Sequence, residues 1–265
     1  MRIKDNLLRH PCRELPARSM RLRLAIALSS LLAAPLAALA QSASAPTPAS
    51  APGKVAPVVQ LGVDVPPYYV AGGTYGAPPS VAVDPLYDKL LASSRRSDIQ
   101  QAVVAIAAKP ELVKPDTLIV LAMRLYDVGL RDDAVFWYYA GRDRFLTMAQ
   151  VLDMRSIQLM HSAEITEAFL RAAGPAMDGY AYCSVARQAE QEDRAIAWVA
   201  ANPYKILGYS ELPGATEDRN AALVDAVNHL RDASRKKKAL LDDPKTLGEL
   251  MDARARNQAH ERYCW

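Results

Sequence analysis

The sequence predicts an all-α domain of about six to eight helices that includes one repeat-like helical hairpin. Three observations support this fold class. Apolar residues recur at spacings of three and four through most of the chain after residue 84. Proline, glycine and helix-capping residues divide this part of the chain into segments of helical length. No segment shows sustained alternation of apolar and polar residues between hairpin turns, as half-buried β-strands would.

The first forty residues predict a secretory signal peptide. The stretch "RLRL" (21–24) opens an apolar run that ends in "ALA" (38–40), and a cut is expected after Ala40. The alternative is an uncleaved anchor, for which the apolar run is short. The segment before Met20 is long and carries acidic residues and prolines, which favours Met20 as the true start of translation.

Removal of residues 1–40 reverses the charge of the chain. These residues hold seven of the 32 basic and two of the 29 acidic side chains, which leaves 25 basic and 27 acidic. The formal net charge therefore moves from +3 to −2. Nothing in this balance favours nucleic acid or an anionic membrane as a partner. We expect a periplasmic or secreted protein without stable membrane insertion after signal cleavage.

Two irregular segments are expected before the helical domain. Residues 41–57 are rich in Ala, Ser and Pro, which predicts a disordered tether. Residues 58–83 contain Pro-Pro and Gly-Gly, which predicts an irregular arm. The all-α domain is then expected over residues 84–265.

The helices of this domain are delimited by capping residues and by Pro or Gly. Gly174-Pro175 is expected to end the fifth helix, and Asn202-Pro203 the sixth. The basic run "RKKK" (235–238) is expected at a solvated helix end. Helices are predicted over residues 85–92, 98–109, 117–128, 132–149, 163–173, 180–201, 216–241 and 244–260.

The third and fourth segments predict an antiparallel hairpin. About three residues around Gly129 separate them, so the second helix must fold back on the first. Small residues on the facing stripes would let the two axes approach closely. These stripes consist of Leu118, Leu121, Ala122, Leu125 and Val128, and of Ala134, Tyr138, Gly141, Phe145 and Met148.

This hairpin, residues 116–149, resembles a tetratricopeptide repeat or its relative in the Sel-type repeats. The proline that closes many such repeats is absent, and Leu146 lies near its place. The chain shows no second convincing copy, although a stable array normally needs about three. The resemblance therefore implies a helical domain with one repeat-like hairpin. Its motif positions are Leu121, Ala122, Leu125, Gly129, Ala134, Tyr138 and Gly141.

The aromatic run "FWYY" (136–139) covers several sides of one helix. A helix that is apolar on several faces is usually packed between neighbours, so burial is the first prediction. The alternative is a partly exposed patch that binds a partner, since interface centres favour aromatic residues beside arginines. The residues of that possible partner surface are Trp137, Tyr139, Arg142 and Arg144.

Cys183 and Cys264 are the two cysteines left after removal of the signal peptide. An even number of cysteines in an oxidising compartment predicts a disulfide between them. Closing a loop of this length would stabilise the fold by about 4 kcal/mol in the chain-entropy model. Two buried free thiols are the alternative.

No motif predicts a metal, a cofactor or a catalytic residue. The three histidines after residue 40 are far apart, and the cysteines lack the short spacing of metal ligands. "GYSEL" (208–212) lacks the second glycine of a nucleophile elbow, and "AGGTYG" (71–76) lacks the lysine of a phosphate loop.

These observations favour an exported helical module that binds another protein. It could serve as an envelope adaptor or as an immunity-type inhibitor of a toxin that acts in the periplasm; the latter rests on analogy of fold. A hypothesis from another class is an all-α hydrolase acting on the cell wall. That activity would require a cleft with two carboxylates of raised pKa.

Overall fold

A computed structural model describes residues 55–61 and 85–265. The predicted signal peptide (1–40), and most of the predicted tether (41–57) and arm (58–83), lie outside the described residues. The described part of the chain is helical, and its one β-type pairing is an isolated bridge between Leu152 and Gly214. The all-α prediction is therefore confirmed. In chain order the elements are α1 (Pro85–Leu91), α2 (Arg96–Ala108), η1 (Pro110–Leu112), α3 (Pro115–Asp127), α4 (Arg131–Val151), α5 (Met160–Ala181), α6 (Val185–Ala201), η2 (Lys205–Gly208), α7 (Arg219–Asp242), α8 (Pro244–Arg256) and α9 (Ala259–Tyr263).

Helices α3 and α4 form the predicted hairpin, and Gly129 makes the turn between them. Gly129 has φ +79°, a conformation that costs glycine little and other residues more. Its N–H donates to the Tyr126 carbonyl at 3.0 Å, and the Leu130 N–H donates to the Leu125 carbonyl at 2.8 Å. This pair of bonds is the Schellman arrangement, which satisfies carbonyls at the end of α3.

The two helices of the hairpin touch at Gly141. A Cβ at this position would lie 2.8 Å from Ile119 Cγ1 and 3.0 Å from the Pro115 carbonyl oxygen. The backbone of α4 therefore rests directly on α3, as the small residues of the predicted stripes suggested. Eleven of the thirteen residues of α3 are buried, because α3 lies between α4 and the α1–α2 pair.

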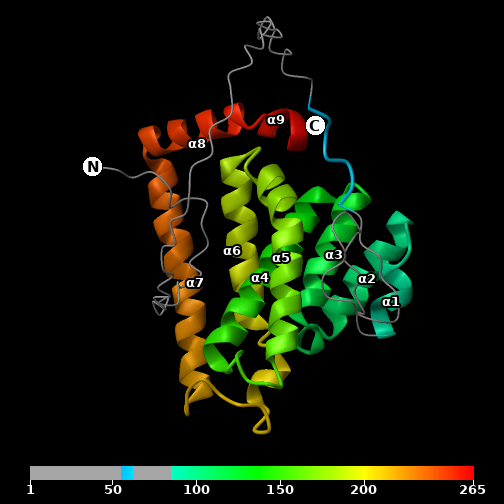
Figure 1. Cartoon of the computed structure of the whole chain (residues 1–265), viewed down its shortest axis with the longest axis vertical. Helices are drawn as coiled ribbons and strands as arrows, with labels where there is room; N and C mark the ends of the chain where they lie inside the picture. Colours follow the sequence, from blue (N-terminus) through cyan, green and yellow to red (C-terminus); the bar gives the residue numbers. More distant parts are fainter. Residues whose placement is uncertain (1–54, 62–84) are drawn as a thin grey trace, which may run out of the picture. The chain divides into compact units, whose positions relative to one another are not determined.

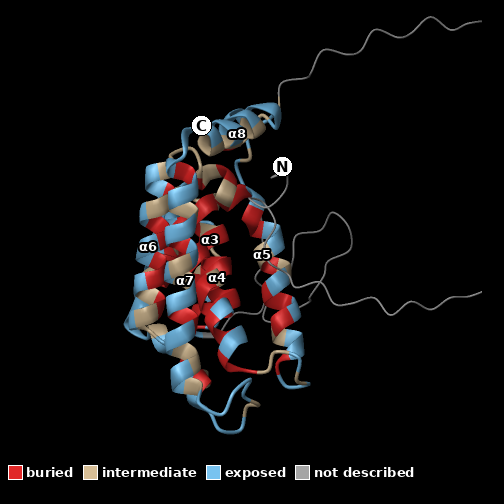
Figure 2. Cartoon of the chain, turned by 90° about the vertical axis from the view of Figure 1, so that its left-hand side faces the viewer, coloured by how far each residue is buried: buried red, intermediate tan, exposed pale blue. Residues whose placement is uncertain are grey.

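Helix α4 is the central helix of the described domain. It packs against α3, α5, α6 and α7, and Figure 2 shows it largely buried between helices whose outer faces are exposed. Helix α7 runs beside α6, and α8 crosses the end of these helices (Figure 1). Most of the buried apolar residues form one cluster around α3, α4 and α5, and a second cluster surrounds Phe145, Met148 and Leu152.

The predicted end of the fifth helix at Gly174-Pro175 is wrong, because α5 continues through both residues to Ala181. Tertiary packing explains the continuation. The Tyr138 hydroxyl would lie 3.0 Å from a Cβ at Gly174, so the missing side chain makes room for this ring. The same hydroxyl donates to the Leu170 carbonyl at 3.3 Å. A residue pair that would end an isolated helix is thus accommodated by α4.

Three further helix boundaries also differ from prediction. Helix α6 begins after Ser184, whose side chain accepts a hydrogen bond from the Arg187 N–H, and not at Tyr180. Helix α7 is capped by Asp218 and not by Thr216. The expected last helix is divided in two, because Gln258 adopts φ 51° between α8 and α9.

The close contact at Gly141 generates a prediction about stability. Gly141→Ala should lower the free energy of unfolding by about 1–3 kcal/mol, because the new methyl group meets the backbone and side chain of α3. Gly248→Ala is the matched control. No atom lies within 4 Å of a Cβ at Gly248 in α8, so that change should raise stability by up to about 1 kcal/mol. Urea denaturation measures both, and shifts of the same sign would contradict the packing described here.

Candidate functional site

Charged and polar side chains gather in the interior between α4, α6 and α7. Each helix contributes residues at spacings of three or four, so the side chains of one helix share a face. We call this group the polar core cluster. Its members are Tyr139, Arg142 and Asp143 from α4, Gln188 and Glu192 from α6, and Ser234 and Lys237 from α7.

Arg142 and Glu192 are the centre of the polar core cluster. Arg142 Nε donates to Asp143 Oδ1 at 2.8 Å, and Arg142 Nη2 donates to Glu192 Oε1 at 3.3 Å. Lys237 Nζ donates to the same oxygen of Glu192. The Arg142 guanidinium also lies 4.5 Å from the centre of the Tyr139 ring. Two cations and two carboxylates thus pair with one another inside the protein.

Neutral polar groups extend the cluster to α5. Tyr139 donates to Asp178 Oδ1 at 3.3 Å and accepts a hydrogen bond from Gln188 Nε2 at 3.3 Å. Ser234 donates to Glu192 Oε2 at 3.5 Å. The cluster therefore links four helices through side chains that lie far apart in the sequence.

The two carboxyl groups of the cluster shift in opposite directions. Burial would raise the pKa of Glu192, but Lys237 and Arg142 together outweigh burial, and the pKa lies below its usual range. Burial raises the pKa of Asp143, and Arg142 offsets only part of this effect. Asp143 Oδ2 is buried without a hydrogen-bond partner among the described residues, which agrees with that direction. Burial likewise lowers the pKa of Lys237, and Glu192 only partly compensates.

The cluster does not match the hydrolase hypothesis. That activity would need two carboxylates of raised pKa in a cleft, whereas only Asp143 has a raised pKa and Glu192 has a lowered one. The side chain of Asp143 is 0% exposed and that of Glu192 is 6% exposed. Both already contact Arg142, and their burial closes this pair to a substrate.

The prediction that the aromatic run packs between helices is confirmed for Trp137, Tyr138 and Tyr139, with Phe136 partly buried, and the alternative of an exposed patch is wrong. Trp137, Tyr139 and Arg144 are 5%, 1% and 1% exposed, and the Arg142 side chain is 17% exposed. The reason is the position of α4, which neighbouring helices cover on every side that carries these residues. Trp137 packs edge-to-face on Trp198 at 5.3 Å, so its contacts are internal.

Arg144 ties two connecting segments to α4, the one between α2 and α3 and the one after α6. Its Nη1 donates to the carbonyls of Pro110 and Val113 at 2.7 Å, and its Nη2 donates to the Asn202 carbonyl at 2.6 Å. Its guanidinium also lies 4.5 Å from the centre of the Trp198 ring. Burial lowers the pKa of Arg144 to about 10. Arg144 therefore has a structural role.

The basic run 235–238 is only in part the solvated helix end that the sequence suggested, because Arg235 and Lys236 are exposed whereas Lys237 and Lys238 are partly buried. Lys237 pairs with Glu192 and Lys238 pairs with Asp193, so two successive lysines of α7 bind two successive acids of α6. The sequence of α6 carries a pattern that could have predicted buried polar contacts with a neighbouring helix. Its buried stripe continues at helical spacing from apolar residues into polar ones, and it consists of Gln188, Gln191, Glu192, Ala195, Ile196 and Val199.

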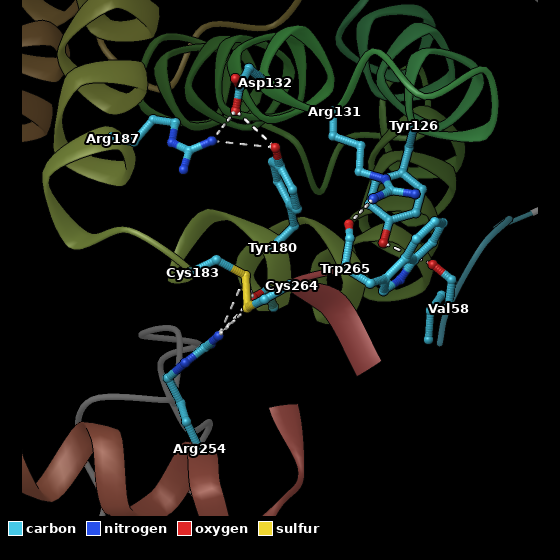
Figure 3. The surroundings of a disulfide bond; sticks show 11 residues. Val58, Tyr126, Arg131, Asp132, Tyr180, Cys183, Arg187, Arg254, Cys264 and Trp265 are labelled. Carbon is cyan, nitrogen blue, oxygen red and sulfur yellow. Dashed lines mark hydrogen bonds and ion pairs between the residues drawn. A yellow bond between two sulfur atoms is a disulfide. The ribbon is translucent and has the colours of Figure 1, made fainter. Parts of the chain in front are cut away.

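The predicted disulfide between Cys183 and Cys264 is confirmed, with Cα atoms 5.6 Å apart. It joins the turn between α5 and α6 to the end of the chain (Figure 3). Beside it, Arg131 Nη1 donates to the Trp265 carbonyl at 2.8 Å, and the guanidinium lies 3.6 Å from the centre of the Trp265 ring. Sequence reasoning missed Arg131, because its partner lies 134 positions away.

The described N-terminal segment 55–61 docks at the same end of the domain. The Val58 N–H donates to the Arg262 carbonyl at 2.8 Å, and the Val58 carbonyl accepts from the Tyr126 hydroxyl at 3.0 Å. The Leu61 N–H donates to Asp127 Oδ1 at 2.7 Å. Segment 55–61 thus lies between the end of α3 and α9.

Apolar side chains are exposed at the other end of α4. The loop after α4 and the loop before α7 lie side by side, because the Asp153 N–H donates to the Pro213 carbonyl at 2.9 Å. We use the name loop patch for three exposed apolar side chains of these two connections and of the first residue of α5: Ile157, Met160 and Tyr209. They are 86%, 47% and 44% exposed. A pocket of about 230 Å³ opens in the same region, and its lining includes Tyr204, Leu207, Arg219 and Leu223.

Residues 55–61 and 85–265 contain neither a metal-binding cluster nor a helix that could span a membrane. No group of three or more His, Cys, Asp or Glu side chains there is arranged to hold a metal ion. None of the described helices has the length and apolar character needed to cross a membrane.

Comparison with known proteins shows a relative of this chain. An uncharacterized protein of Haemophilus influenzae is 30% identical over 209 residues, which cover 79% of this chain and 80% of that protein. No model of a known protein family matches the chain, and no solved structure matches it.

The polar core cluster generates a prediction about stability and pH. Glu192→Gln should lower the free energy of unfolding by about 3 kcal/mol, the lower end for a buried pair, because it leaves the partly buried Lys237 without its counter-charge. The matched control is Asp193→Asn, which breaks the Lys238 pair. Its side chain is 55% exposed, so the loss should stay within about 1 kcal/mol.

The pH dependence of this loss follows from the lowered pKa of Glu192. A depressed carboxyl pKa contributes stability above the pKa of an unfolded glutamate, and this contribution is lost as the pH falls through the folded-state value. The difference between wild type and Glu192→Gln should therefore shrink in acid. Denaturation at neutral and acidic pH measures it, and a difference that is independent of pH would contradict the assignment.

Proposed function

The chain belongs to one family with the uncharacterized Haemophilus influenzae protein, and for this member we propose an exported helical module that acts by binding another protein. Two features support the proposal. The Cys183–Cys264 disulfide fits an oxidising compartment, and the sequence "RLRLAIALSSLLAAPLAALA" (21–40) has the order of a signal peptide.

Binding is favoured over catalysis by where the reactive groups lie. The carboxylates of the polar core cluster are buried and paired with cations, and Glu192 links α6 to α4 and α7. The loop patch, in contrast, presents apolar side chains to solvent. Exposed apolar side chains are what a protein-binding surface needs, and the two connections that carry these lie side by side. The loop patch is therefore the proposed contact surface.

The proposed protein-binding function has two versions, an envelope adaptor and an immunity-type inhibitor of a periplasm-acting toxin. The resemblance of α3–α4 to a tetratricopeptide or Sel-type unit is part of the proposal and rests on the motif residues alone. A gene for a secreted toxin beside this gene would favour the inhibitor. Conserved envelope-assembly genes would favour the adaptor.

The first test concerns export. The full chain expressed in a bacterium should yield a periplasmic protein that begins at Gln41 and contains the disulfide. Intact mass under non-reducing conditions measures both properties. A chain that lacks residues 1–40 is the control, and it should stay in the cytoplasm with both thiols free. Retention of residues 20–40 on the exported protein would overturn the proposal.

The second test concerns the contact surface. A photoreactive amino acid in place of Met160 should give discrete adducts with a partner in cells, and the additional change Ile157→Asp should abolish them. Because Ile157 is 86% exposed, this change should alter folding stability by no more than about 0.5 kcal/mol.

Val104→Asp is the matched control for this second test. Val104 lies on α2 and is 70% exposed, so it offers a similar apolar side chain away from the loop patch. Adducts from position 160 should survive Val104→Asp. Adducts that persist in Ile157→Asp, or that are lost equally in both variants, would reject the loop patch.

A further inference from the structure

A cation lies against both sulfurs of the disulfide. Arg254, on α8, places Nη2 3.5 Å from Cys264 Sγ and 3.8 Å from Cys183 Sγ (Figure 3). The same nitrogen donates to the Gly179 carbonyl at 3.0 Å, which fixes the guanidinium in this position. Both cysteine residues are only partly buried.

This arrangement favours cleavage of the disulfide by exchange. When a thiolate attacks one sulfur of a disulfide, the other sulfur departs as a thiolate, and it departs faster when its pKa is lower. A neighbouring arginine lowers the pKa of a thiol by stabilising the thiolate. Arg254 is close enough to serve whichever sulfur departs.

The disulfide is surrounded by contacts that involve the C-terminal residues and segment 55–61. Cys264 precedes Trp265, which contacts Arg131 through its carbonyl and its ring. Cys264 follows α9, a helix of five residues, and the Tyr263 ring packs on Gly179 so closely that a Cβ there has no room. Segment 55–61 is joined to the C-terminal residues through the Val58–Arg262 hydrogen bond.

We propose that the Cys183–Cys264 disulfide is a reducible clasp, in which exchange with a dithiol releases the C-terminal residues and segment 55–61 while Arg254 stabilises the departing thiolate. The remainder of the domain stays folded, because α3 to α7 are held by their own core and by the polar core cluster. This inference depends on the disulfide and is independent of the proposed partner.

The exchange balances in two steps. One thiolate of the dithiol bonds to one sulfur of the pair, and the S–S electrons leave with the other sulfur, which takes up a proton. The second thiolate of the dithiol then attacks the mixed disulfide and releases the remaining protein sulfur, which is protonated in turn. The dithiol is oxidised to a disulfide, and Cys183 and Cys264 become thiols.

The first experiment measures the rate at which dithiothreitol reduces the oxidised protein at fixed pH. Arg254→Gln should slow reduction by at least about threefold, because the leaving thiolate loses its counter-charge. Arg254→Lys should restore most of the rate. Arg256→Gln, two positions along α8 and exposed, should match wild type. A rate for Arg254→Gln that equals or exceeds wild type would overturn the role of Arg254.

The second experiment compares amide hydrogen exchange in oxidised and reduced wild-type protein. The Val58 amide should exchange at least about tenfold faster after reduction, because the Arg262 carbonyl that it binds is released. The Leu61 amide should exchange faster to a similar extent, because segment 55–61 leaves Asp127 of α3 together with Val58. The Leu130 amide, in the α3–α4 turn, should keep its protection. Unchanged exchange at Val58 and Leu61 would overturn the clasp. An equal rise at Leu130 would overturn it as well, since the disulfide would then stabilise the whole fold.

Discussion

The contact of α4 with α3 at Gly141 is the constraint on which the rest of the domain depends. Because residue 141 has no side chain, the backbone of α4 lies on α3, and the opposite side of α4 remains free for α5, α6 and α7. A helix enclosed in this way must find internal partners for every polar group that it carries. The sequence of α4 includes Arg142, Asp143 and Arg144, so the enclosure creates both the polar core cluster and the Arg144 tie.

The polar core cluster offers a physical reason for the register of the outer helix. Apolar surfaces can slide past one another at little cost, whereas Lys237 and Lys238 each face one particular acid of α6. Buried ion pairs add little net stability compared with apolar residues of the same volume, but a mispaired one is strongly unfavourable. We therefore interpret the Glu192 contacts as a device that selects one alignment of α7 on α6. The exposed Lys238–Asp193 pair continues the same alignment to the surface.

The sequence predicted the fold where local signals agree with tertiary packing. Gly129 ends α3 as expected because a turn of three residues needs its positive φ, and the two cysteines pair as expected. The prediction fails at Gly174-Pro175, where Tyr138 from α4 occupies the space above the glycine and the helix continues. The polar core cluster was not predicted from the sequence, because Arg142, Glu192 and Lys237 lie about fifty residues apart. In α6, Gln188 and Glu192 continue the apolar stripe at helical spacing, which is a signal for buried polar contacts. This pattern does not identify the partners in α4 and α7.

The two ends of α4 differ in how they are held, and this difference connects the fold to its proposed role. At the start of α4, the Cys183–Cys264 disulfide and the Arg131–Trp265 contact hold the C-terminal residues. Segment 55–61 binds beside them through the Val58–Arg262 hydrogen bond. Where α4 finishes, the adjoining loops are held by hydrogen bonds, among them those from Arg219 to the carbonyls of Leu207, Tyr209 and Leu212. Loops that rest on such bonds can adjust to a partner at lower cost than packed helices can. A contact surface at the loop patch and a clasp at the disulfide would therefore act independently, since the buried length of α4 separates them.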